Sequence, residues 1–177
     1  MVAASARVLA WPVAWYIRSE RDRLERQAKP LTGEVRGTLG AYFGAADLDR
    51  VRIAELTTIR VPGGGLSAPA RRLGFRFPSP KSVAAIALDH VIASQVPMNS
   101  ALLFHELVHV VQYRLLGGVG PFASEYVHGF LATGSYDDIP LERCAYELGS
   151  RYELGGAPFS VAEEVARRLP KGSSSHW

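Results

Sequence analysis

The chain has 177 residues, 47% of them hydrophobic and 21% charged, with a formal net charge of +3. This length predicts one domain with a single buried core, and the composition excludes disordered, collagen-like and repeat architectures. The positive charge shows no aromatic interleaving and no known motif, so we interpret it as solvated surface and not as a nucleic-acid site. It gathers in two places, Arg18 to Lys29 and the group Arg71, Arg72 and Arg76.

The chain has one cysteine, Cys144. It can form no intramolecular disulfide, and one thiol cannot make a multi-cysteine zinc site. Because small secreted domains usually depend on disulfides, a reducing compartment such as the cytoplasm is favoured. We interpret Cys144 as a small buried residue.

The first segment, residues 2–17, is largely apolar but shorter than the ~20 residues that a membrane-spanning helix needs. Its positive charges follow the apolar run, whereas a signal peptide has them first. We predict that residues 1–30 form an amphipathic leader helix packed on its own domain. Its aromatic residues, followed by arginines, also suit a helix lying on a membrane surface, so membrane contact through residues 2–29 is an alternative, as is a cleaved or spanning segment. These aromatic residues are Trp11, Trp15 and Tyr16.

The main domain is expected over residues 31–172, after a break at Lys29-Pro30, with 173–177 as a disordered tail. Its first half predicts a short helix followed by extended segments. The helix covers 32–43, and the extended segments are 51–61, 73–77 with period-two alternation, and 83–92, the best strand in the chain.

The second half predicts helices. Asn99 or Ser100 can cap a helix over 101–116 that is apolar on almost every side and therefore buried. Further helices are expected at 122–131, 141–153 and 161–169. Strands followed by helices indicate an α+β fold, with a small antiparallel or mixed sheet.

The buried helix contains the sequence His105-Glu106-Leu107-Val108-His109. Residues four apart on a helix share a face, so both imidazoles can bind one metal ion. Glu106 lies beside them and can reach a water molecule there without being a ligand. The alternative is two ordinary histidines with an unrelated glutamate, but a bare polar group in an apolar helix is costly.

A catalytic zinc site needs a third protein ligand. The downstream candidates are His128, Glu142, Cys144 and Glu147. We favour Glu142, because the small residues on its helix face allow close approach to the first helix. Glu147 points about 140° away from Glu142 on a regular helix.

The segment from His105 to Tyr113, together with Ile139 to Glu147, resembles the zincin-like metallopeptidases with a glutamate third ligand. These include bacterial domains of unknown function associated with contractile injection systems. The broader gluzincin group shares a Glu-x-x-Ala pattern, here Glu142 to Ala145. The resemblance covers roughly residues 73–152. It implies a zincin fold, with an edge strand on one side of the metal and the two ligand helices on the other.

We therefore predict a Zn²⁺-dependent peptidase acting on a peptide or protein substrate, with His105, His109 and Glu142 as ligands and Glu106 as general base. The candidates for stabilising the oxyanion are Tyr126, His128 and Tyr136. Gln112, one turn beyond His109, can hydrogen-bond a ligating histidine. An extended substrate can pair with the edge of strand 83–92. The alternatives are a non-catalytic zinc-stabilised binding or regulatory module and an injected effector of the same fold.

Overall fold

The computed structural model describes residues 2–60 and 83–170, with side chains from residue 9 onward. Within these ranges the chain is α+β, as predicted. The helices are α1 (Val2–Glu25), α2 (Gly33–Leu39), α3 (Ala45–Arg50), α5 (Ser100–Leu116), α6 (Val119–Thr133), α7 (Pro140–Glu153) and α8 (Val161–Arg168). The strands are β1 (Lys29–Pro30), β2 (Arg52–Glu55), β3 (Ala85–Leu88) and β4 (Val91–Ser94).

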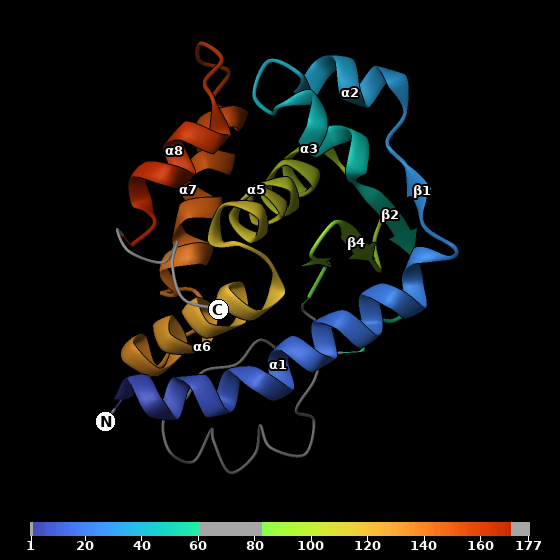
Figure 1. The fold of residues 1–177 in the computed structure, drawn as a ribbon. Helices are drawn as coiled ribbons and strands as arrows, with labels where there is room; N and C mark the ends of the chain where they lie inside the picture. Colours follow the sequence, from blue (N-terminus) through green and yellow to red (C-terminus); the bar gives the residue numbers. More distant parts are fainter. Residues whose placement is uncertain (1, 61–82, 171–177) are drawn as a thin grey trace.

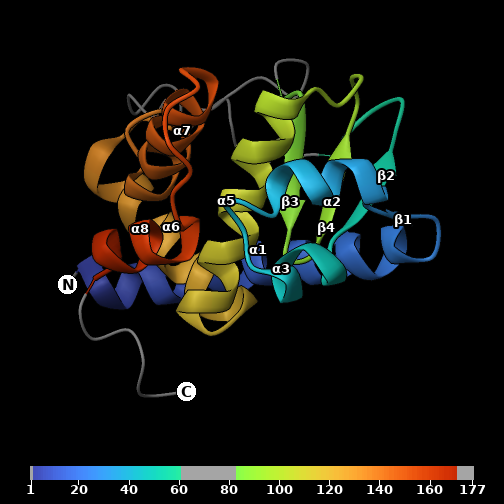
Figure 2. The ribbon, with the colours of Figure 1, turned by 90° about the horizontal axis from the view of Figure 1, so that it is seen from above.

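The strands form a mixed sheet in the order β1-β2-β4-β3. β2 runs parallel to β4, while β1 pairs with β2, and β3 with β4, in the antiparallel sense. Figures 1 and 2 show α1 on one side of this sheet and α2 and α3 on the other. The predicted strand over 73–77 lies outside the described residues.

The prediction of one strand over 83–92 is wrong. This segment is a hairpin, in which a two-residue turn at Asp89 and His90 joins β3 to β4. Asp89 has φ +60°, a conformation that aspartate tolerates better than most residues. Its carboxylate is held by Arg21 at 3.2 Å and by Arg50 at 3.1 Å. The turn contains no glycine. Its aspartate is held by Arg21 and Arg50, which are distant in sequence, and by the neighbouring His90 at 3.3 Å.

Helix α5 lies between the sheet and helices α6 to α8 (Figure 2). Asn99, one of the two residues that the sequence offered as a cap, caps its start by accepting a 2.8 Å hydrogen bond from the amide of Leu102. Its end is marked by Gly117, whose φ of +94° favours glycine. Arg114 joins it to α3 through a bidentate pair with the buried carboxylate of Asp47, at 2.6 and 3.0 Å. Both ends of α5 and its contact with α3 are thus fixed.

Helix α1 packs along α6 and against the sheet (Figure 1). The buried side chains of α1 belong to the same core as those of α5. They recur every three to seven residues and are Ala10, Ala14, Ile17 and Leu24. None of the helices in the described part of the chain is long and apolar enough to cross a membrane.

Candidate metal centre

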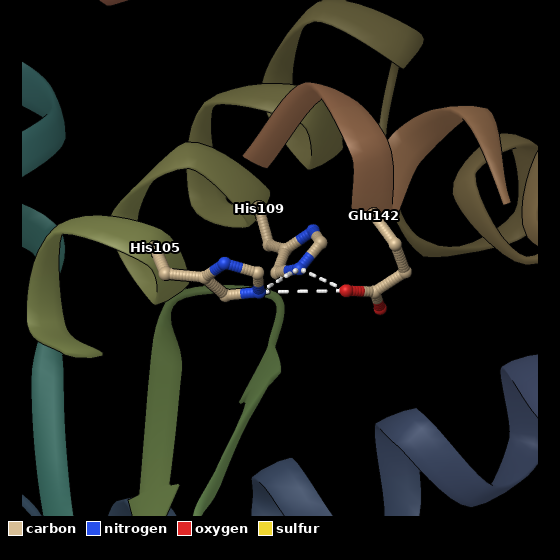
Figure 3. Close-up of side chains that lie close together, drawn as sticks. All are labelled: His105, His109 and Glu142. Carbon is tan, nitrogen blue, oxygen red and sulfur yellow. Dashed lines mark hydrogen bonds and ion pairs between the residues drawn. The ribbon is translucent and has the colours of Figure 1, made fainter. Parts of the chain in front are cut away.

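Helix α5 presents His105, His109 and Gln112 toward α7. His105 and His109 are one turn apart, and their rings point to the same place in Figure 3. The aliphatic neighbours Leu107, Val108 and Val110 are completely buried. The histidines therefore lie on a rigid element, and their positions are determined by the packing of α5.

Helix α7 brings Glu142 to the two histidines. Pro140 occupies its first turn, where the missing amide hydrogen costs nothing. The start of α7 lies very close to α6, because a Cβ on Gly129 would be only 2.8 Å from Cδ of Pro140. Glycine at this position lets the two helices touch, and the contact places Glu142 opposite His105 and His109.

Three atoms of these residues form a nearly equilateral triangle. The Nε2 atoms of His105 and His109 are 3.1 Å apart, and each lies 3.4 Å from Oε2 of Glu142. Ligands held tetrahedrally at ~2.0–2.2 Å from a zinc ion would lie about 3.3–3.6 Å from one another. Within the described ranges, this is the one group of three such side chains whose donor atoms converge closely enough to hold a metal ion.

The charge at this site also favours a cation. Oε2 of Glu142 has no hydrogen-bond partner, and no other buried side-chain oxygen or nitrogen of the described residues lacks one. Burial would raise the pKa of this carboxyl, but His109 and His105 outweigh it and hold the pKa well below its usual range. Burial would likewise lower the pKa of His109, yet Glu142 raises it to about 9. A buried carboxylate oxygen of this kind calls for an explanation, and a cation bound between it and the two imidazoles would be one.

Outer contacts hold two of the three ligands in place. Gln112 accepts from Nδ1 of His109 at 2.8 Å and donates to the carbonyl of Leu141 at 2.9 Å. The predicted contact between Gln112 and His109 is present, and it leaves Nε2 of His109 free to coordinate. On the other side, Tyr126 donates a 2.7 Å hydrogen bond to Oε1 of Glu142, so that Oε2 faces the histidines.

Glu106 lies next to the triangle and is buried. Burial is the main cause that raises its pKa to about 7, and the neighbouring Glu142 adds to it. The charge of His109 lowers this pKa, and so does a hydrogen bond between the carboxyl and the backbone of Ala87 on β3. A carboxyl with this pKa can exchange a proton at neutral pH.

The structure brings most of the predicted site residues together. His105, His109 and Glu142 converge, and Tyr126 donates a hydrogen bond to Glu142. Glu106 lies close enough to His109 and Glu142 for their charges to shift its pKa. Burial and then the charge of Glu142 raise the pKa of Tyr136 far above its usual range, although a hydrogen bond with Tyr126 opposes this.

The remaining candidates lie elsewhere. His128 is exposed on α6 and is not one of the three converging residues. Cys144 is buried, as expected, and is not one of them either. Glu147 is exposed and pairs with Arg143 and Arg168.

Two features of the site were not predicted. Tyr146 is half exposed on α7, with its ring centroid 4.6 Å from that of His105. Its spacing of four residues from Glu142 was a usable signal, since positions one turn apart share a face. The close contact at Gly129 had no such signal, because it depends on how α6 and α7 meet in space.

Comparison of the chain with protein-family models, with curated proteins and with solved structures gave no match. The resemblance to zincins therefore rests on the sequence motif alone.

Proposed function

We propose that this chain is a zinc-dependent metallopeptidase in which His105, His109 and Glu142 hold the metal. The observation that carries the proposal is Oε2 of Glu142, which is buried without a hydrogen-bond partner 3.4 Å from both Nε2 atoms. A cation among these atoms would satisfy the carboxylate and both imidazole lone pairs. Two histidines and one carboxylate with an open fourth position form a donor set typical of catalytic zinc.

When bound, zinc would lower the pKa of a coordinated water toward ~7 and polarise a substrate carbonyl. Glu106 supplies the base. Its pKa of about 7 suits it to accept a proton from the attacking water and to deliver it to the leaving amine. Such transfer contributes ~10²–10⁴-fold to the rate. Of the candidates for an oxyanion donor, Tyr126 and Tyr136 both lie beside Glu142, whereas His128 is exposed on α6.

Among the described strands β3 lies at the edge of the sheet, where a peptide substrate could pair. The backbone amide of Gln95 donates to the carbonyl of Ala84. In an antiparallel pair, hydrogen-bonded and non-hydrogen-bonded residues alternate, so the main-chain N–H and C=O groups of Ala85 and Ala87 point away from β4. Tyr113 and Glu106 already engage Ala87. An extended peptide would therefore pair at Ala85, next to the metal group, through main-chain bonds that require no particular side chain.

The test begins with metal content. The wild-type chain, Glu142→Gln and Glu147→Gln are purified without chelator and compared by elemental analysis. We expect one zinc per chain, lost in Glu142→Gln and retained in the control Glu147→Gln, whose carboxylate lies exposed on the same helix. Absence of zinc from the wild type, or equal retention in all three, would overturn the ligand assignment.

Activity is then tested with a peptide library. Glu106→Gln should keep its zinc and lose cleavage by at least ~10²-fold. If the wild type holds one zinc and cleaves no peptide, the metal site stands and the peptidase proposal fails in favour of a non-catalytic zinc module.

A further inference from the structure

Helix α1 carries two different stripes of side chains. The buried stripe described above faces α6 and the sheet. A second stripe, spaced by three or four residues, is exposed from residue 11 onward. It consists of Trp11, Trp15, Arg18, Asp22 and Arg26, the last just beyond the helix end. The indole rings of Trp11 and Trp15 are 71% and 61% exposed. Large aromatic rings left this open, one turn apart on one helix, indicate a contact surface.

The charges along this exposed stripe leave it cationic. Asp22 is paired with Arg21 at 2.8 Å. Arg18 and Arg26 form no ion pair with any of the described residues, and Lys29 follows them at an exposed position. The stripe is therefore aromatic over its first turns and positively charged over its last ones.

We propose that the exposed stripe of α1 docks on the headgroup region of an anionic bilayer, with the helix axis along the membrane plane. Indole rings have an apolar body and a polar N–H, which suits them to the boundary between acyl chains and headgroups. Arginines in the same stripe would contact anionic headgroups. The opposite stripe remains buried against α6, so docking requires no unfolding of the domain.

The area of the stripe favours a membrane over a second copy of the chain. Trp11 and Trp15 together expose at most about 330 Å², taking about 250 Å² per side chain. A stable protein interface buries about 800 Å² per partner. A single convex helix with unpaired cations also lacks an acidic patch to pair with in a symmetric dimer, whereas a bilayer surface supplies negative charge in any orientation.

The proposal is tested with the full chain and lipid vesicles. Phosphatidylcholine vesicles with and without phosphatidylglycerol are mixed with protein and separated by flotation. Trp177→Phe serves as the background, because Trp11 and Trp15 are then the only tryptophans of the three in the sequence. We expect flotation with the anionic vesicles only, a blue shift of the tryptophan emission, and weaker binding at high salt.

Two double variants separate the contributions. Trp11→Ser/Trp15→Ser should abolish flotation. Arg18→Gln/Arg26→Gln should weaken it about 25-fold, because each cation near an anionic surface contributes about fivefold. The control Arg36→Gln/Arg167→Gln removes the same charge from α2 and α8 and should bind as the wild type does.

Circular dichroism verifies that each variant is folded. The proposal is overturned if the wild type does not float with anionic vesicles, or if the tryptophan variant floats equally well. It is also overturned if light scattering shows a dimer that Trp11→Ser/Trp15→Ser dissolves, since a second copy would then occupy the stripe.

Discussion

Replacing Tyr126 with phenylalanine should weaken zinc binding about 10- to 100-fold and leave the fold intact. The hydroxyl of Tyr126 donates a 2.7 Å hydrogen bond to Oε1 of Glu142. A hydrogen bond to a charged group contributes ~1.5–3 kcal/mol, which corresponds to roughly 10- to 100-fold in affinity. Loss of a hydrogen bond that orients a metal ligand typically lowers metal affinity by this factor, because the carboxylate of Glu142 would have to be ordered by the metal itself.

The assay is competition for zinc with a coloured chelator, measured on metal-free protein. Tyr146→Phe is the matched control, because this tyrosine contacts His105 through its ring and not through its hydroxyl. Its affinity should stay within about twofold of the wild type. Equal zinc affinity for Tyr126→Phe and the wild type would refute the reasoning that this hydroxyl orients Glu142.

Three further predictions concern stability. Gly129→Ala should lower the melting temperature, because its Cβ would lie 2.8 Å from Cδ of Pro140. Gly149→Ala is the control: its Cβ would enter open space, and it should raise the free energy of unfolding by up to about 1 kcal/mol. Equal melting temperatures for the two variants would contradict this. Free zinc at about 100 times its Kd should stabilise the folded chain by ~2.7 kcal/mol in calorimetry, and a chelator should reverse this. A melting temperature that neither zinc nor chelator changes would show that zinc does not bind the folded chain in preference to the unfolded chain. The side chains of Asp89 and then Glu25 raise the pKa of His90 above ~6.5, although burial opposes this. The stability that His90 contributes is thus fully present below about pH 6.5 and is lost as the pH rises through its folded pKa. The stability difference between wild type and His90→Gln should shrink over that range, and a constant difference in denaturant titrations at several pH values would be inconsistent with it.

The sequence was sufficient for the parts of the site that depend on helical periodicity. His105 and His109 had to share a face once their helix was recognised, and Gln112 followed on the same face. Glu142 is favoured over Glu147 because small residues share its helix face. These inferences need helical spacing and residue size, without knowledge of how the helices pack.

The features that could not be predicted depend on contacts between distant segments. The hairpin turn at Asp89 lacks a turn-forming glycine, and Arg21 and Arg50, far away in the chain, hold it. The hydrogen bond from Tyr126 to Glu142 exists because α6 and α7 meet at Gly129. Tertiary packing of this kind leaves no periodic signal in the sequence.

X-ray absorption at the zinc edge of the zinc-loaded chain tests the central claim most directly. We predict four-coordinate zinc with two imidazole nitrogens and carboxylate oxygen at ~2.0–2.2 Å, and no sulfur. Glu142→Gln, loaded in the same way, should lose this spectrum. A sulfur shell near ~2.3 Å, which only Cys144 or a methionine could supply, or fewer than two imidazoles in the wild type, would contradict the site formed by His105, His109 and Glu142.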